Sequence, residues 1–195
     1  MFDGSQAKPY LPDDLPDPQS VYGSSKLEGE KQVRKFTQGQ AVIIRTAWVC
    51  SAHGHNFVKT MLRLFKERTE VNVVVDQVGT PTWANGLARI IWKTMAKPNV
   101  HGICHWTDAG VASWYDFAVA IQEEALIIGL LDKPIEIVPI PSKSYLLPAP
   151  RPSSSILDKS SLFELFDCAT NNFAPQHWRV SLREMLKDLK HDDKR

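Results

Sequence analysis

The sequence predicts an α/β fold, because short runs of β-branched residues alternate with segments that have a helical pattern of apolar residues. Residues 41–45 (Ala-Val-Ile-Ile-Arg) and 71–75 (Val-Asn-Val-Val-Val) are typical of strands, and the first has the unbroken apolar character of a buried parallel strand. Between them, residues 57–68 place phenylalanine, methionine and leucine side chains on one face of a helix. A strand, a helix and a second strand in this order favour an α/β sheet.

The remaining elements follow the same alternation. Residues 1–20 contain four prolines and are expected to form a loop, and Ser20 is placed to cap a helix that follows it. The other expected elements are helices from Trp83 to Met95, from Trp114 (capped by Ser113) to about Ile128, from Ser160 to Phe166 and from His177 to Leu189, and strands at 102–106 and 135–139. Five prolines between 139 and 152 predict a surface loop, and the residues from Lys187 onward are expected to be a frayed, charged tail.

Composition limits the classes of function. The chain has 195 residues, of which 43% are hydrophobic, so it can bury the core of one domain. The formal net charge is +1 and the charges are mixed, so neither nucleic acid nor an anionic membrane is expected as a partner. No apolar run approaches the roughly 20 residues of a membrane span, and the first residues lack a signal-peptide pattern. Three scattered cysteines fit a reducing, cytoplasmic location.

Tyr22 and Lys26 are the strongest candidates for chemistry. Four residues separate them, so they lie one turn apart on the same face of the predicted helix. An ammonium group beside a phenol stabilises the phenolate, and such a phenol can donate a proton to a carbonyl oxygen while a hydride reaches the carbon. The alternative interpretation of this pair alone is an interfacial tyrosine with a solvated lysine.

Several motifs resemble those of one enzyme superfamily. They are Phe2-Asp3-Gly4, Pro9-Tyr10, Tyr22-Gly23-x-x-Lys26-x-x-Gly29-Glu30, Arg45-Thr46-Ala47-Trp48-Val49, residues 56–62, residues 76–82, Arg151-Pro152 and Trp178. In this order, over nearly the whole chain, they are similar to motifs of the extended short-chain dehydrogenase/reductases, and within them to the dTDP-4-dehydrorhamnose reductase family. The resemblance implies the C-terminal portion of a Rossmann-type NAD(P)-binding fold with a small α/β substrate-binding lobe.

The resemblance also implies an activity and a set of site residues. The reaction would be the NADPH-dependent reduction of dTDP-4-dehydro-L-rhamnose to dTDP-L-rhamnose in polysaccharide biosynthesis, with NADH as an alternative cofactor. Tyr22 would protonate the C4 oxygen, and Lys26 would bind the nicotinamide ribose. The nucleotide-sugar substrate would be held by Trp48, Asn56, Phe57 and Arg151. Without the resemblance, Trp48 is compatible with a core tryptophan and Arg151 with a solvated loop arginine.

One motif of the superfamily is missing. The ten glycines include no Gly-x-Gly-x-x-Gly or Gly-x-x-Gly-x-x-Gly run, and the resemblance begins partway into the fold. We therefore expect the chain to lack the nucleotide-binding first half, on the order of 100 residues, together with a catalytic Ser or Thr. The expected organisation is a single partial domain. Residues 1–50 would be a remnant of the Rossmann half, and 51–195 would be mostly the substrate-binding lobe and closing helices. An uncovered strand at 42–45 would favour self-association or a homodimer.

The sequence leaves other functions open. The chain could be a fragment without activity of its own, or a non-catalytic regulatory or interaction relative of the methionine adenosyltransferase beta subunit type. It could also be another nucleotide-sugar reductase or epimerase of the superfamily. Some relatives hold magnesium through glutamates, but residues 83–85 contain no carboxylate, and His53 and His55 lack further ligands nearby. No metal is therefore predicted.

Overall fold

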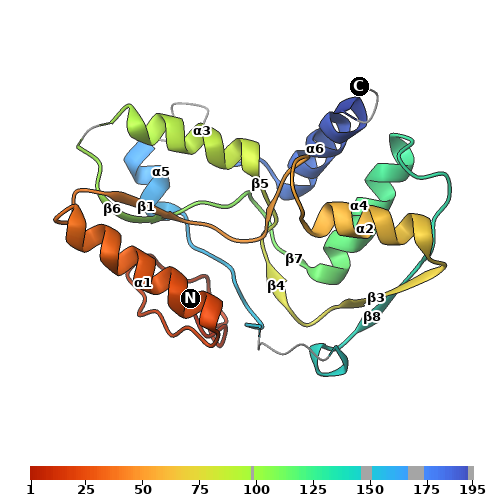
Figure 1. Ribbon diagram of the computed structural model, residues 1–195, viewed down its shortest axis with the longest axis horizontal. Helices are drawn as coiled ribbons and strands as arrows, with labels where there is room; N and C mark the ends of the chain where they lie inside the picture. The colour runs from red at the N-terminus through yellow and green to blue at the C-terminus, as the bar shows by residue number, and fades with distance from the viewer. Residues whose placement is uncertain (98, 146–150, 167–173, 193–195) are drawn as a thin grey trace.

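The protein is described by a computed structural model that covers residues 1–97, 99–145, 151–166 and 174–192. Its helices and strands form two lobes, which are joined by a group of short strands (Figure 1). Parallel strands alternate with helices in both lobes, so the prediction of an α/β fold is confirmed. None of the described helices is both long and apolar enough to span a membrane.

The first lobe is built on two parallel strands, β1 (Val42–Arg45) and β6 (Gly102–His105). Helices α3 (Ala84–Met95) and α5 (Ser160–Phe166) lie on one side of this pair and bury an apolar cluster against it (Figure 1). Helix α1 (Val21–Phe36) lies on the other side. It begins where the sequence predicts, because the Ser20 hydroxyl accepts a 3.2 Å hydrogen bond from the Gly23 N–H.

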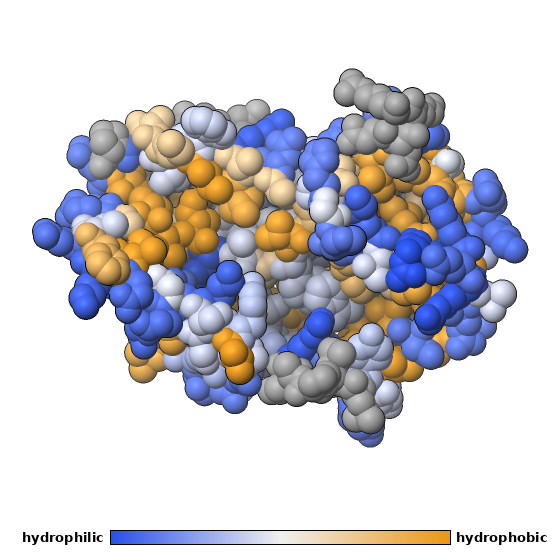
Figure 2. Space-filling view, viewed as in Figure 1, coloured by the Kyte–Doolittle hydropathy of each residue, from blue (hydrophilic) through white to orange (hydrophobic). Residues whose placement is uncertain are grey.

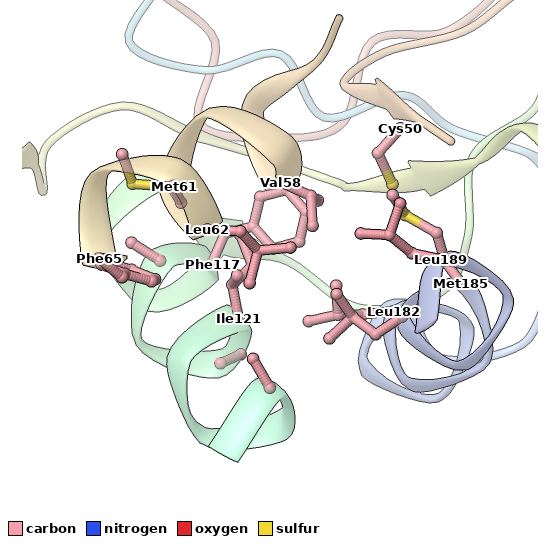
Figure 3. Close-up of a cluster of buried hydrophobic side chains, with 14 of the residues drawn as sticks. Cys50, Val58, Met61, Leu62, Phe65, Phe117, Ile121, Leu182, Met185 and Leu189 are labelled. Carbon is pink, nitrogen blue, oxygen red and sulfur yellow. The ribbon is translucent and has the colours of Figure 1, made fainter. Parts of the chain in front are cut away.

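The second lobe contains the main hydrophobic core. Helices α2 (Phe57–Glu67), α4 (Trp114–Ile127) and α6 (Trp178–Asp192) surround it, together with the parallel strands β3 (Glu70–Val74) and β8 (Glu136–Ile140). Figure 3 shows side chains from the three helices converging on one cluster. The Ser113 hydroxyl and the Asp116 carboxylate form a reciprocal capping box at the start of α4, so the predicted cap is present.

Four strands of two residues each connect the lobes. Strand β2 (Val49–Cys50) pairs in parallel with β5 (Thr82–Trp83), and β4 (Val78–Gly79) pairs antiparallel with β7 (Ala112–Ser113). These strands are not predictable from the sequence, because two residues are too few to show an alternating pattern. A short 3₁₀ helix, η1 (Ser142–Ser144), follows β8, and its first residue is held by Asp76, which accepts from the Ser142 N–H at 2.8 Å.

The end of the chain differs from the expectation of a frayed tail. Helix α6 continues through Lys187 to Asp192, because Leu186 and Leu189 are buried in the main core. The apolar residues of α6 recur every three or four positions, so they form one face that packs against the core. The opposite face of the helix is highly charged. The expected loop between 139 and 152 lies partly outside the described residues. The first lobe also takes up segments after residue 50, since β6, α3 and α5 belong to it, and the division of the chain at residue 50 remains a prediction.

Candidate functional site

Tyr22 and Lys26 line one cavity of about 470 Å³ at the carboxyl end of β1. Both side chains lie on the same face of α1, with the Lys26 ammonium nitrogen 5.3 Å from the centre of the Tyr22 ring. Residues 43–47 form the opposite wall. The Tyr22 side chain is 73% exposed, so its phenol is accessible to a ligand. Ligands of open α/β sheets commonly bind at this end of the strands.

A buried ion pair fixes the helix that carries these two residues. Arg45 donates to both carboxylate oxygens of Glu30 at 2.9 and 3.0 Å, and its third contact is a 3.1 Å hydrogen bond to the Pro12 carbonyl. The two side chains are only 8% and 12% exposed. Such a bidentate pair sets direction as well as distance, so it joins α1, the end of β1 and the N-terminal loop. Glu30 follows Lys26 by one turn on the cavity side of α1.

The N-terminal loop forms a second wall of this cavity. The rings of Phe2 and Tyr10 stack at 4.2 Å, and the Tyr10 hydroxyl donates to Asp3 at 2.7 Å. Hydrogen bonds from Ser5, and then from Tyr10, lower the pKa of Asp3 to about 2. Beneath Phe2 lies the buried His105, whose pKa is lowered to about 4 by burial and then by the charge of Arg45. The loop is therefore an ordered part of the cavity wall.

A larger cavity of about 830 Å³ lies in the second lobe, between one face of α2 and strand β3. Phe57 and Trp114 form an aromatic wall, with ring centres 4.6 Å apart. The charged side chains that line the cavity are three cations and one carboxylate: Arg68, Lys143, Arg151 and Glu70. A cavity of this size with an aromatic wall and an excess of cationic donors suits an anionic, drug-sized ligand.

Of the four predicted substrate residues, two line the larger cavity and two line neither cavity. Phe57 and Arg151 line the larger cavity. Asn56 lines neither of the two cavities. Its side chain caps α2, since Oδ1 accepts from the Lys59 N–H at 3.2 Å and Nδ2 donates to the Ser51 carbonyl at 2.7 Å. Its structural role is thus visible, and its contact with a ligand remains a prediction.

Trp48 does not line the cavity of Tyr22, although its neighbour Ala47 does. Its indole stacks on Trp114, with ring centres 3.5 Å apart and planes 7° from parallel. Trp48 thus lines neither of the two cavities, and its expected contact with the nucleotide sugar remains a prediction. The physical reason for its orientation is that the chain turns at Trp48, where φ is +48°, so that successive side chains point into different lobes.

The linings of the two cavities include residues that are close in the sequence at two places. Ala47 lines the smaller cavity and the next residue stacks on a wall residue of the larger one. Arg151 lines the larger cavity and Pro152 lines the smaller. Sequence reasoning missed Trp114, Arg68 and Lys143, because only long-range packing brings them to this site.

The ion pair of Arg45 with Glu30 was not predicted. The only sequence signal for it is the position of a charged residue at the end of a buried strand, and Arg45 entered the prediction only as part of a motif. Among the described residues, no group of three or more His, Cys, Asp or Glu side chains is arranged to hold a metal ion. Burial raises the pKa of Cys50 to about 12 and that of Cys104 to about 11, so both thiols are protonated at neutral pH. Neither cysteine is therefore a candidate nucleophile.

Known proteins have similar sequences. The spore coat polysaccharide biosynthesis protein SpsK of Bacillus subtilis is 39% identical over 188 residues, which cover 96% of this chain and 61% of that protein. A dTDP-4-dehydrorhamnose reductase of Burkholderia thailandensis is 38% identical, over 97% of this chain and 65% of the relative. The chain thus spans about three fifths of the length of these curated relatives.

A solved structure gives the same result. The dTDP-4-dehydrorhamnose reductase of Bacillus anthracis in complex with NADP superposes with a TM-score of 0.84 at 31% identity, covering 96% of this chain and 62% of that one. The RmlD substrate binding domain matches residues 1–191, which is almost the entire sequence. On this evidence the chain belongs to the RmlD substrate binding domain family.

Proposed function

We propose that this chain is the substrate-binding part of an NADPH-dependent reductase that converts dTDP-4-dehydro-L-rhamnose to dTDP-L-rhamnose. The observation that carries the proposal is the presence of two cavities, one lined by Tyr22 and Lys26 and the other by Arg151. Relatives with 31–38% identity are named as this reductase, and one of them was solved with NADP. The whole reaction belongs to the proposal, because the chain spans only part of those relatives.

The larger cavity would hold the nucleoside diphosphate. Its three cations can neutralise the diphosphate, and the planar guanidinium of Arg151 offers two parallel donors to phosphate oxygens. Phe57 supplies an apolar surface beside them. The hexose would then extend past Ala47 towards the smaller cavity, where the Tyr22 phenol donates a proton to the C4 oxygen. Lys26, one turn away on the same helix face, stabilises the phenolate that remains and binds ribose hydroxyls.

The described residues fit one end of a nicotinamide cofactor. Tyr22 and Lys26 present a phenol and an ammonium group to a cavity that can take a nicotinamide riboside, and the nicotinamide supplies the hydride when it is bound. They offer no cradle for its diphosphate, since the sequence contains no glycine-rich turn of the kind that opens a helix. We therefore expect the 195-residue polypeptide to bind NADPH weakly and to be silent in an NADPH oxidation assay with the keto-sugar.

The same missing motif favours a second candidate, a protein that binds nucleotide sugars without reducing them, as a regulatory or interaction subunit would. Calorimetric titration of the 195-residue chain with NADPH tests the consequence of the missing motif, and turnover of the keto-sugar separates the two candidates. Tight binding would contradict the inference from the missing glycines. If a preparation turns over the keto-sugar with NADPH, Tyr22→Phe should lower turnover by about 10²–10⁴-fold while leaving substrate affinity nearly unchanged. Unchanged turnover would show that another group donates the proton.

Binding of the reaction product tests the substrate assignment directly. Calorimetry should show that the chain binds dTDP-L-rhamnose, and that Arg151→Ala weakens binding by about 10- to 100-fold, because a charge-assisted contact to phosphate is lost. Arg89→Ala is the matched control, since Arg89 is an exposed arginine on α3 that lines neither cavity. Equal effects of the two variants, or no binding to the wild-type chain, would refute the assignment of the larger cavity.

A further inference from the structure

Trp48 has a backbone conformation that bulky residues rarely adopt. Its φ is +48°, in the left-handed region, and it lies between β1 and β2 where the chain leaves the first lobe. Its carbonyl accepts a 3.1 Å hydrogen bond from the Thr82 N–H, so the turn is tied to β5. Conformations of this kind persist only when the surroundings hold them, and they concentrate at functional sites.

Two residues lie close against the indole. Trp114 stacks on it in parallel, with ring centres 3.5 Å apart. Gly79 approaches so closely that a Cβ atom at this position would lie 2.6 Å from Cε2 of Trp48 and 2.8 Å from Nε1. No side chain fits there, which accounts for a glycine with a negative φ in a strand.

Gly79 and Trp114, which lie close against the indole, belong to one structural unit. Gly79 pairs with Ala112 across the β4–β7 ladder, and Trp114 begins α4 directly after β7. Phe57 extends the stack on the side of the larger cavity, 4.6 Å from Trp114. The β4–β7 ladder therefore sets the position of the Trp48 indole relative to both cavities. Gly79 is buried and lines neither cavity, so it can influence a ligand only through its neighbours.

We propose that Gly79 and Trp114 are positioning residues, which fix the Trp48 indole at the junction of the two lobes, so that the side chain already expected to contact the hexose of the bound nucleotide sugar has one orientation. The identity of the ligand rests on the function proposed above. The left-handed turn is the geometry that lets Ala47 face the smaller cavity while Trp48 stacks on a wall residue of the larger one. Because Trp114 covers one face of the indole, a hexose would meet the remaining ring surface, and a fixed indole loses little freedom on binding.

The test uses affinity for dTDP-L-rhamnose and for dTDP, measured by calorimetry on the 195-residue chain. Since a Cβ at position 79 would also meet the Ser155 hydroxyl at 2.5 Å, every variant is made in a Ser155→Ala background. Gly79→Ala should weaken dTDP-L-rhamnose binding about tenfold, the equivalent of one aromatic contact, and should leave dTDP binding within about twofold. Trp114→Leu should weaken binding of the sugar nucleotide, whereas Trp114→Phe, which keeps a stacking ring, should restore most of it.

A double-mutant cycle separates positioning from a general loss of structure. If Gly79 acts through the indole, Gly79→Ala should cause no further loss of affinity once Trp48→Ala has been introduced. Equal losses in both backgrounds, or an unchanged affinity in Gly79→Ala alone, would overturn the proposal. Trp92→Leu is the control, because Trp92 is 71% exposed on α3 and lines neither cavity.

A spectroscopic measurement keeps this proposal separate from the proposed function. Two stacked indoles give a coupled circular dichroism band, which Trp48→Ala, Trp114→Leu and Gly79→Ala should all remove and Trp92→Leu should leave. If the wild-type chain binds no dTDP-L-rhamnose, the substrate assignment fails, and the band alone decides whether Gly79 and Trp114 hold the indole. A band that persists in Gly79→Ala and Trp114→Leu would refute the positioning role.

Discussion

The helices of the two lobes differ in how completely their apolar residues are covered. In the second lobe, α6 buries Leu182, Met185, Leu186 and Leu189 in a core that it shares with α2 and α4 (Figure 3). In the first lobe, α1 has 16 residues, of which only Gly23 is buried. Val21 and Phe36 are 88% and 79% exposed. The second lobe is thus stabilised by its own packing, whereas α1 depends on a few polar contacts, chiefly the Glu30–Arg45 pair.

The same contrast appears on the surface. Figure 2 shows apolar side chains exposed on both lobes, but most of the highly exposed large ones belong to the first lobe. Three large ones lie on α3, where Ile91, Trp92 and Met95 are 43%, 71% and 68% exposed. Within the described residues, β1 pairs on one edge only. The catalytic candidates Tyr22 and Lys26 therefore lie on the lobe whose apolar residues are less completely buried. The cavity assigned to the nucleotide lies on the lobe with the well-packed core.

The largest expected effect is in the main core. Phe117 is 1% exposed and contacts the rings of Phe57 and Trp178. Phe117→Ala should lower the free energy of unfolding by about 3–5 kcal/mol, because both burial and packing are lost. Phe36→Ala on α1 should change it by less than about 0.5 kcal/mol. Urea unfolding followed by circular dichroism measures both, and comparable losses would mean that the two lobes are equally packed.

As the pH falls, the first lobe should begin to lose stability at a higher pH than the second. Burial lowers the pKa of His105 from 6.5 to about 4, so the unfolded chain binds this proton first as the pH falls. Stability is then lost between pH 6.5 and 4, by about 3 kcal/mol in total. In the second lobe, hydrogen bonds from Arg183 and, to a smaller extent, from Arg179 lower the pKa of Glu124 below 4.5. Burial acts in the opposite direction but is outweighed. The contribution of Glu124 is present above that value and is lost only below it.

The variant His105→Gln isolates the first of these ranges. Glutamine can still donate to the Asp158 carbonyl, which Nδ1 of His105 meets at 3.1 Å, but it does not titrate. Thermal unfolding of this variant should show a much smaller loss between pH 6.5 and 4, with the loss at lower pH retained. If the wild type and the variant lose the same stability over that interval, another group is responsible.

Local patterns account for what could be predicted. The helices α2 and α4 and the strand β1 begin and end within about two residues of the expected positions, because their apolar spacing and caps are encoded in short segments. The pairing of Tyr22 with Lys26 needs only one helical turn, and they share a face as predicted. Site residues that are brought together by contacts between distant parts of the chain could not be predicted from local patterns. Trp114 reaches Trp48 only through the β4–β7 ladder and a left-handed turn.

A smaller effect is expected from association between chains. The exposed apolar residues of α1 and the unpaired edge of β1 should make the 195-residue polypeptide self-associate, as sedimentation velocity would show. The double variant Val33→Lys and Phe36→Lys should shift the distribution towards the monomer. Ile127→Lys is the matched control, since Ile127 is 72% exposed but lies on α4 in the second lobe. A wild-type chain that is monomeric at all concentrations would contradict the contrast drawn between the lobes.

The smallest expected effect concerns Gly29, in the middle of α1. A Cβ atom added there would meet nothing within 4 Å, so alanine fits the single chain without strain. Because glycine costs about 0.5–1 kcal/mol relative to alanine inside a helix, Gly29→Ala should stabilise the dilute monomer by that amount. Tyr22, Lys26, Val33 and Phe36 share the helix face of Gly29, so a second chain docking on this face would approach closest at the glycine. The same variant should then weaken self-association while it raises the unfolding temperature of the monomer. If Gly29→Ala stabilises the chain and leaves association unchanged, the chains meet elsewhere, through the edge of β1 or the apolar side chains of α3.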